Sequence, residues 1–343
     1  MEVIKAPNAK LFLKTKSMSY FGSTSYLGLA TLPAFQDAVI NGIKKWGTAY
    51  GSSRHANVKL SIFNDAEMLL SSQLKTEACV TVSSGMLAGK LTIDFLAQSN
   101  SKFYHYPNTH PAILAPNSLP LFINTKLHPT LLTDTIENIV ISVDAIPTAS
   151  VTVVNFSFLK SIPKQKNITL LVDESHSIGI TGESGMGIFS SIPKSLIAKK
   201  IMVASLGKAM GLPGGIIAGN ASFINAIKET TIFTTASGMS PAYLEAYLQS
   251  QAIYKEQKDK LKNNLLYFFE DLNLDETFLF NPNYPNIYNL KPGFYNYLLN
   301  KNIAITHFKY PTPNDVLSRI MLSANHSKID LDLLKKLLIN PLT

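Results

Sequence analysis

One lysine, Lys208, stands in a stretch of unusual composition, VASLGKAMGLPGGIIAG over residues 203–219. Apolar runs flank it, one ending at Ala204 and the next beginning at Ile216, and glycines and a proline lie between them. Glycines at this density let backbone segments pack closely. A lysine held there loses water, which lowers its pKa and leaves the amine free to act as a nucleophile, as a Schiff base requires. A surface turn between two hairpin strands is the alternative.

A second stretch carries an acid and a histidine. Residues 169–188 read TLLVDESHSIGITGESGMGI, in which an apolar run is followed by Asp173 and, three residues later, His176. An acid just past a buried strand lies at the carboxyl end of a sheet, where open α/β folds bind their ligands. Asp173 could pair with a protonated ring nitrogen, which is how proteins tune pyridoxal phosphate as an electron sink, and His176 could reach the same ring.

Together the two stretches resemble the α-oxoamine synthases, a family of fold-type I pyridoxal phosphate enzymes, and are closest in type to 8-amino-7-oxononanoate synthase. VDESHSIGITGESGMG resembles the family's VDDAHGxGxxGxxGxG segment, and Ser205-Leu206-Gly207-Lys208 resembles its T-F-x-K motif. The motifs occur in the family's order, and the resemblance extends from about Tyr26 to the C-terminus. It implies that Lys208 holds the cofactor, that Asp173 keeps the ring nitrogen protonated, and that His176 orients the phenolic oxygen. Ser205 is implied as a further cofactor-binding residue.

A candidate phosphate site follows the apolar run from Glu77 to Val82. The sequence continues Ser84-Gly85-Met86, and a strand followed by Ser-Gly and a helix presents free backbone N–H groups at a helix N-terminus. The segment resembles the family's S-G-[FY]-x-A-N, which implies that Ser84, Gly85 and Met86 bind the cofactor phosphate. An ordinary serine-capped helix is the alternative.

Three more residues are implied to bind the cofactor. His110 matches the family's N-H-A-S-[IL], whose histidine stacks on the pyridine face, and Ser157 matches the serine of V-F-S-M-[DE]-G, which reaches the phenolic oxygen. Ser237 lies in a segment that resembles [FY]-S-T-S-x-P-P-A, where a hydroxyl reaches the cofactor phosphate of the other subunit. A homodimer with shared active sites is therefore expected.

Two basic residues are implied to bind the substrate. Arg319 lies seven residues before His326, the spacing of the family's A-R-[IFL]-x-[LM]-S-A-x-H, whose arginine grips the amino-acid carboxylate. A guanidinium offers a carboxylate two parallel hydrogen bonds. Lys309 opens the segment Lys309-Tyr310-Pro311-Thr312-Pro313, where some relatives carry a second arginine. A glycine- and serine-rich loop over residues 47–54 resembles a family loop near the active site.

The implied reaction is the decarboxylative condensation of a small amino acid with an acyl-CoA to an α-amino ketone. Lys208 would remove the α-proton, and His110 and His176 would assist as catalytic residues. Another reaction of fold-type I enzymes, such as aminotransfer or aldol cleavage, is one alternative, and a non-catalytic partner subunit is the other. The sequence leaves the amino acid and the acyl chain open.

Periodicity predicts an α/β fold with a mainly parallel central sheet flanked by helices, and the resemblance adds a smaller C-terminal α+β domain. Apolar runs predict strands at about 77–82, 151–156, 169–173 and 201–204, and apolar spacing predicts helices at 33–46 and 58–74, with a long one at 241–274. We expect a short N-terminal segment (1–35), a large cofactor-binding domain (36–225) and a small domain (226–343). The segment before Tyr26 is shorter than in the family.

Composition limits the remaining possibilities. The chain has 343 residues, of which 46% are hydrophobic, and carries a formal charge of +8 with only two arginines, Arg54 and Arg319. Its single cysteine, Cys79, rules out an internal disulfide framework. The first residues lack the long apolar run of a signal peptide, and we expect no membrane span, no nucleic-acid partner and no metal. A cytoplasmic protein is expected.

Overall fold

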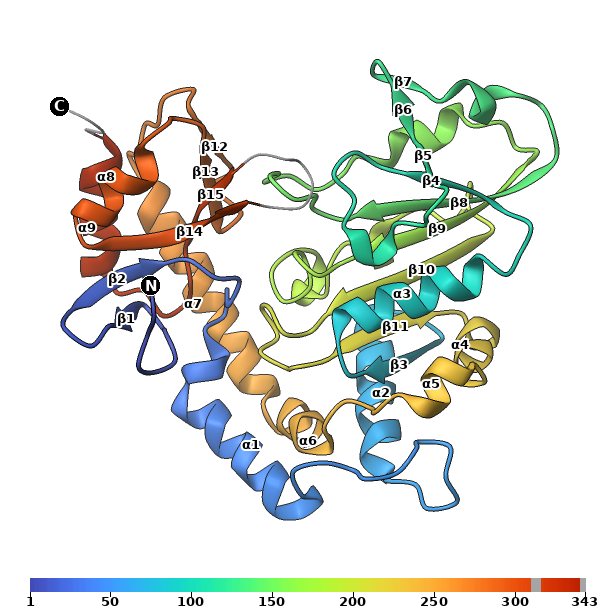
Figure 1. Ribbon diagram of the computed structural model, residues 1–343, viewed down its shortest axis with the longest axis horizontal. Coiled ribbons are helices and arrows are strands. Elements are labelled where there is room, and N and C mark those ends of the chain that lie inside the picture. The colour runs from blue at the N-terminus through green and yellow to red at the C-terminus, as the bar shows by residue number, and fades with distance from the viewer. Residues whose placement is uncertain (310–315, 340–343) are drawn as a thin grey trace.

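The computed structural model describes residues 1–309 and 316–339 and divides into two parts, each built on its own sheet (Figure 1). The long helix α7 lies between them. The strands are β1 Lys10–Phe12, β2 Ser17–Phe21, β3 Ala78–Val82, β4 Lys102–His105, β5 Leu119–Pro120, β6 Phe122–Ile123, β7 Lys126–Leu127, β8 Glu137–Asp144, β9 Lys166–Asp173, β10 Lys199–Ser205, β11 Gly215–Gly219, β12 Phe278–Phe280, β13 Asn286–Asn289, β14 Ile303–Lys309 and β15 Val316–Met321. The α-helices are α1 Pro33–Trp46, α2 Ser61–Leu74, α3 Gly85–Leu96, α4 Ala221–Lys228, α5 Thr231–Thr235, α6 Pro241–Gln249, α7 Gln251–Phe269, α8 Phe294–Asn300 and α9 Lys328–Ile339.

The larger sheet has the order β3-β11-β10-β9-β8-β4-β5. β10, β9, β8, β4 and β5 pair in parallel, and β11 runs antiparallel to both β10 and β3. β3 therefore shares the direction of β10, and the carboxyl ends of all strands except β11 meet at one edge. The predicted mainly parallel α/β fold is confirmed.

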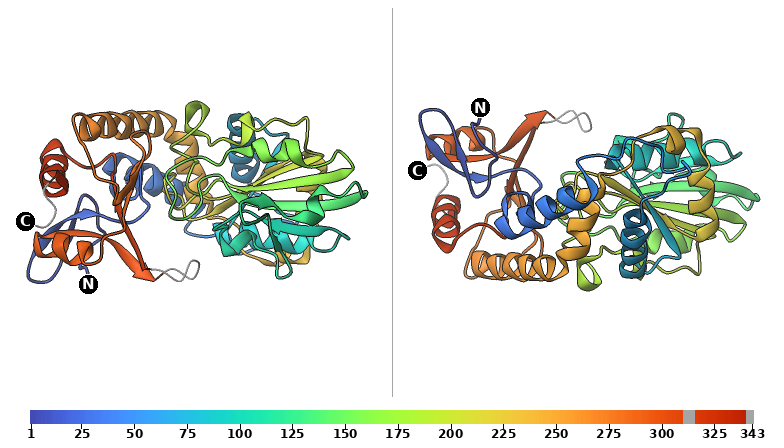
Figure 2. Two further views of the ribbon diagram at one scale, coloured as in Figure 1. Left: turned by 90° about the horizontal axis from the view of Figure 1, so that it is seen from above. Right: turned by 90° about the horizontal axis from the view of Figure 1, so that it is seen from below.

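Both faces of this sheet are covered by helices, as the two views in Figure 2 show. Side chains alternate between the faces, because successive residues of a strand point to opposite sides. On β10, Ile201 and Val203 join the cluster beneath α3 and α4, whereas Met202 and Ala204 join the larger cluster on the opposite face. Burial on both faces explains why these strands are continuous apolar runs.

The smaller sheet joins the two ends of the chain. Its order is β1-β2-β14-β15-β13-β12, with β2 and β14 parallel and all other neighbours antiparallel. β1 and β2 come from the segment 1–35, so this segment packs with the C-terminal strands. The boundaries expected after residues 35 and 225 stay a prediction.

Three predicted elements differ from the structure. No strand covers residues 151–156, where the chain forms a loop and then a 3₁₀ helix at Phe156–Ser161, and the strand lies earlier as β8. The helix expected at 241–274 is broken at Ser250 into α6 and α7. β10 and β11 form an antiparallel hairpin, which confirms the two hairpin strands of the alternative interpretation of residues 203–219. The helix at 33–46 is confirmed.

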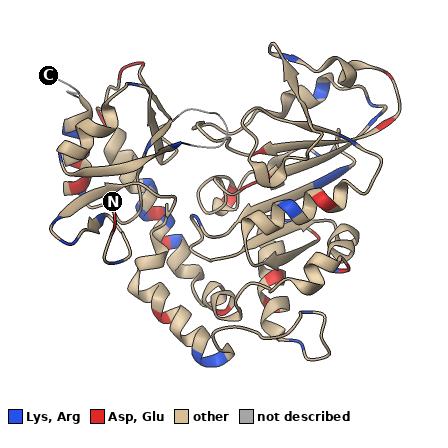
Figure 3. Ribbon diagram, viewed as in Figure 1, with Lys and Arg blue, Asp and Glu red and all other residues tan. Residues whose placement is uncertain are grey.

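Charged residues are spread along the whole ribbon and do not gather on one element (Figure 3). Within residues 1–309 and 316–339, no helix combines the length and apolar character needed to cross a bilayer.

Candidate active site

A cavity of about 160 Å³ lies at the carboxyl edge of the larger sheet. Seven of the residues predicted from the sequence line it: Gly85, Met86, His110, Asp173, His176, Ser205 and Lys208. Ala112, Asp144, Thr148 and Ser175 complete its wall. Each of these residues follows or ends a strand that points toward this edge or begins a helix there, so the parallel topology brings together residues that are far apart in the sequence.

One wall of the cavity is the N-terminus of α3. Ser84 caps this helix, its side-chain oxygen accepting a hydrogen bond from Leu87 N at 3.1 Å. The first helical residue, Gly85, lies directly against β10, since a Cβ there would stand 2.5 Å from Ser205 Cβ and 2.6 Å from Ser205 Cα. The glycine lets the helix start, with its free N–H groups, come close to the end of β10. Such a helix start favours a bound anion.

Two carboxylates lie side by side on neighbouring strands. Asp144 and Asp173 are paired in the register of β8 with β9, and both are buried. Asp173 Oδ1 accepts from Ser175 N at 2.8 Å. Asp144 Oδ2 accepts from His110 N at 3.0 Å, whereas its Oδ1 is buried without a partner in the described structure. Burial, reinforced by the neighbouring Asp173, raises the pKa of Asp144 well above its usual range.

Lys208 and His176 are in direct contact. Lys208 Nζ lies 3.0 Å from His176 Nε2. Burial lowers the pKa of Lys208, although the carboxylates of Asp173 and Asp144 oppose this shift. Burial also lowers the pKa of His176 well below its usual value, and the positive charges of Lys208 and Arg319 act in the same direction. Burial of this lysine therefore shifts its pKa in the direction that favours the uncharged amine.

Arg319 lies on β15 and is buried, with its Nη2 donating to Ser23 O at 3.0 Å. Its Nε has no partner in the described structure, so one guanidinium donor is left for another group. Its charge contributes to lowering the pKa values of Lys208 and His176, which places it electrostatically at the same site. Lys309, at the end of β14, is exposed. Residues 310–313 of the predicted substrate motif lie outside the described residues.

The structure does not bring every predicted residue to the cavity. Ser157 is exposed on the 3₁₀ helix after residue 155, and Thr148 occupies the cavity wall instead. This corrects the placement of Ser157, which rested on the resemblance of its segment to V-F-S-M-[DE]-G. Ser237 is exposed in the loop between α5 and α6 and does not line the cavity of its own chain.

The loop over residues 47–54, which resembles a family loop near the active site, does not line this cavity. Arg54 does not line the cavity and pairs instead with Glu67, Nη1 to Oε1 at 2.8 Å. The guanidinium also stacks on the ring of Phe63.

Sequence reasoning missed Asp144, Thr148, Tyr26 and Asn286 as site residues. Asp144 ends the apolar run NIVISVD, which carries the same signal that identified Asp173. Tyr26 is hydrogen-bonded to both His176 and Asn286, and only the tertiary structure brings these three residues together.

Residues 131–336 match the model of the family described as aminotransferase class I and II. The chain belongs to the aminotransferase class I and II family. Among its relatives, the 8-amino-7-oxononanoate synthase of Petrotoga mobilis is 27% identical to this chain over 95% of this chain and 89% of its own length. Serine palmitoyltransferase of Sphingobacterium spiritivorum is 26% identical over 75% of this chain and 66% of its own. The predicted resemblance to the α-oxoamine synthases is confirmed.

Solved structures support the same fold for this family member. A serine palmitoyltransferase variant from S. paucimobilis, determined with a bound PLP–myriocin aldimine, superposes with a TM-score of 0.80 at 17% identity, covering 98% of this chain and 90% of that one. The 8-amino-7-oxononanoate synthase of Francisella tularensis gives a TM-score of 0.68 at 21% identity, covering 93% and 97%. The predicted fold-type I class is confirmed.

Proposed function

We propose that this chain catalyses the decarboxylative condensation of a small amino acid with an acyl-CoA, which yields an α-amino ketone, free CoA and CO₂. It is an enzyme of the α-oxoamine synthase class and uses pyridoxal phosphate. The observation that carries the proposal is the cavity in which the amine of Lys208, the carboxylate of Asp173 and the N-terminus of α3 face one space.

The residues present fit pyridoxal phosphate. A Cβ at Gly85 would overlap Ser205, so glycine is what lets the start of α3 lie this close to β10, and the orphaned Oδ1 of Asp144 shows that the polar cavity wall has unused hydrogen-bonding capacity. Lys208 would hold the aldehyde carbon, Asp173 the ring nitrogen, and the backbone of Gly85 and Met86 the phosphate. The bound cofactor supplies an aldehyde that condenses with amines and a ring that accepts the electron pair released at the α-carbon.

The chain's own residues would bind the substrate and move its protons. Arg319 would hold the carboxylate of the amino acid, because its Nε is unused and a carboxylate favours a guanidinium. The amine of Lys208, whose pKa is lowered by burial, would take the α-proton and return a proton to the product. His110 would pack against the ring, held through its backbone N–H by Asp144. Most of the acceleration would come from positioning and electrostatics.

A spectroscopic experiment tests the cofactor site. Adding pyridoxal phosphate to the purified protein should produce an imine absorbance band that Lys208→Ala abolishes and Lys199→Ala keeps. Lys199 is a matched control because it is an exposed lysine on the strand that leads to Lys208. A band of equal intensity in Lys208→Ala would overturn the assignment of this lysine.

A product assay separates the proposed reaction from its alternatives. The loaded enzyme is incubated with alanine, glycine or serine and with acyl-CoAs of increasing chain length, and free CoA thiol is measured. Release of CoA that needs both substrates supports the condensation. A keto acid formed without CoA release would establish aminotransfer instead, and absence of any turnover across the whole matrix would favour a non-catalytic subunit.

We also propose that the chain acts in the cytoplasm as a homodimer with shared active sites. Ser237 is exposed and lies away from its own chain's cavity, so its hydroxyl is available to a second copy. Light scattering on the full-length protein tests this proposal, and a fully active monomer would contradict it.

A further inference from the structure

The hydroxyl of Tyr26 lies at the centre of a buried hydrogen-bond network. Tyr26 OH stands 3.0 Å from His176 Nδ1, on the side of the imidazole opposite to Lys208. Asn286 Nδ2 donates to the same hydroxyl at 3.1 Å. Tyr26 is fully buried, and its ring meets His176 edge to face, with centroids 6.4 Å apart. The network therefore joins the N-terminal segment, the smaller sheet and the catalytic lysine.

The directions of these hydrogen bonds follow from donor counting. Tyr284 OH donates its hydrogen to His176 O at 3.0 Å, so its oxygen can only accept from Asn286, whose Nδ2 lies 3.4 Å away. The structure accordingly turns the NH₂ group of Asn286 toward both tyrosines, which leaves its Oδ1 buried without a partner among the described residues. Tyr26 OH accepts one of those hydrogens, and its own hydrogen is left to point at His176 Nδ1.

With Nδ1 accepting from Tyr26, a neutral His176 would carry its proton on Nε2. That Nε2–H would then face Lys208 Nζ at 3.0 Å as the donor. Lys208 can accept that hydrogen bond only as an uncharged amine, and burial shifts its pKa in that direction. The charged or titratable groups that act on His176 are Lys208, Arg319 and His110, and all three disfavour the imidazolium.

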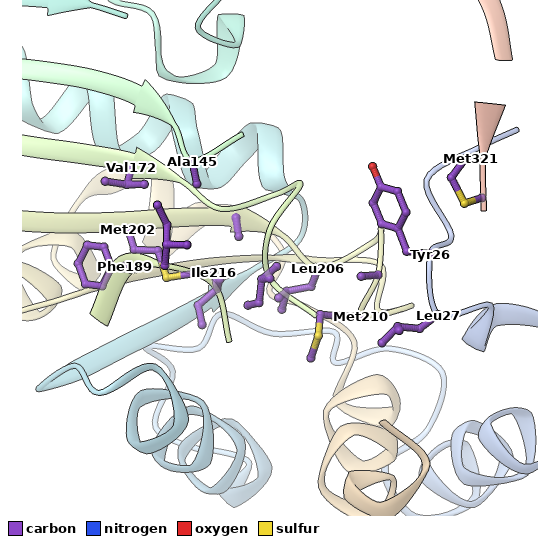
Figure 4. Close-up of a cluster of buried hydrophobic side chains, with 14 of the residues drawn as sticks. Tyr26, Leu27, Ala145, Val172, Phe189, Met202, Leu206, Met210, Ile216 and Met321 are labelled. Atoms are coloured by element: carbon purple, nitrogen blue, oxygen red, sulfur yellow. The ribbon is translucent and has the colours of Figure 1, made fainter. Parts of the chain in front are cut away.

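The backbone around Tyr26 is held by other elements. Ala324 N donates to Tyr26 O at 3.0 Å, and Gln257 Nε2 of α7 donates to Leu27 O at 2.8 Å. Gly28 has a positive φ of 64° and packs directly against Asn325, leaving no room for a Cβ. The ring belongs to the same buried cluster as Leu206, Met210 and Met321 (Figure 4). The hydroxyl is thus presented to His176 from a rigid support.

We propose that Tyr26 is a positioning residue that holds His176 as the neutral tautomer with its proton on Nε2, so that the imidazole is a hydrogen-bond donor toward Lys208 and the cofactor site. The tautomer itself is independent of the reaction, whereas its catalytic consequence rests on the function proposed above. In the enzyme with its cofactor, the Nε2–H group of His176 would then already be a donor before the substrate binds, and His176 would not need to change its tautomer.

Nitrogen-15 NMR of the histidines in the full-length protein tests this inference. His176 is assigned by the signal that His176→Gln removes, first without cofactor and then with pyridoxal phosphate. The wild type should show a bare Nδ1 and a protonated Nε2. Tyr26→Phe should bring the two shifts together, because both tautomers become populated. Tyr104→Phe, which removes an equally buried tyrosine hydroxyl bonded to Thr130, should leave the His176 signals unchanged.

A second variant keeps the inference testable if Tyr26→Phe does not fold. Asn286→Asp puts an acceptor where the NH₂ group was, so Tyr26 must donate to it and accept from His176. The proton of His176 should then move to Nδ1. A wild-type protein with the proton on Nδ1, or a tautomer that Tyr26→Phe and Asn286→Asp both leave unchanged, would overturn the inference.

Kinetics separate this inference from the proposed function. Tyr26→Phe should lower the rate of CoA release by roughly tenfold to a hundredfold, less than the full contribution of a general acid or base. Its affinity for pyridoxal phosphate should change little, because Tyr26 does not line the cavity. If the NMR result holds and no CoA is released even by the wild type, the proposed function fails and the assignment of Tyr26 stands.

Discussion

The buried ion pair between Arg54 and Glu67 offers the sharpest test of how this fold is stabilised. Only 11% and 8% of the two side chains are exposed, and Arg54 Nη2 donates a second hydrogen bond to Glu67 Oε2 at 3.0 Å. Glu67 Oε1 also accepts from Thr81 N at 2.7 Å, next to the end of β3. Arg54→Met removes the cation and leaves the carboxylate buried. Because an unpaired buried charge is costly, we expect the free energy of unfolding to fall by about 3–5 kcal/mol.

Denaturant unfolding of three variants checks this expectation. The double variant Arg54→Met with Glu67→Gln should lose less than Arg54→Met alone, because the neutral amide oxygen can still accept from Thr81 and no charge is stranded. Lys75→Met breaks the pair with Glu183, whose side chains are 56% and 70% exposed, and should cost about 0–1 kcal/mol. A loss below about 1 kcal/mol for Arg54→Met, or a double variant less stable than the single one, would refute the reasoning.

Two further predictions concern a buried acid and the start of α3. Burial raises the pKa of Glu174 from 4.5 to about 7, so its stabilising contribution is complete below pH 4.5 and is lost as the pH rises through 7. Between these pH values the free energy of unfolding should fall by about 3 kcal/mol. Glu174→Gln should remove this pH dependence when the free energy of unfolding is measured at several pH values, and a variant with the same pH dependence as the wild type would contradict the prediction. Gly85→Ala places a Cβ 2.5 Å from Ser205 Cβ and should weaken pyridoxal phosphate binding about tenfold in an absorbance titration. Gly51→Ala meets nothing within 4 Å and should bind as the wild type does; equal affinities of the two variants would count against the phosphate cradle.

The sequence alone identified seven of the residues that line the candidate cavity. The runs before Asp173 and Lys208 are buried on both faces of a parallel sheet, so they are continuous apolar stretches that end next to residues lining the cavity. Gly85, Met86 and His110 were found through short motifs at the ends of strands or helices. Such motifs can be identified from the sequence because each occupies a single turn between two regular elements.

The strand assignment failed where two candidate runs competed. Residues 151–156 are as apolar as a strand, but they leave the sheet after β8 and lead into a 3₁₀ helix. β8 pairs with both β9 and β4, and this long-range pairing decides which run becomes the strand. The motif match of Ser157 lies in this same segment outside the cavity, whereas Asp144, which ends β8, and Thr148, which follows it, line the cavity.

By itself, the sequence determined which residues could carry an amine, a carboxylate and a phosphate cradle, and that a mainly parallel sheet would align them. Only the tertiary structure decided which groups surround them. The contact of Tyr26 with His176 spans 150 positions, and that of Asn286 with Tyr26 spans 260. The hydrogen bonds around His176 involve side chains from distant segments, and no local pattern encodes such an arrangement, since it forms only when the segments around residues 26, 176 and 286 pack together.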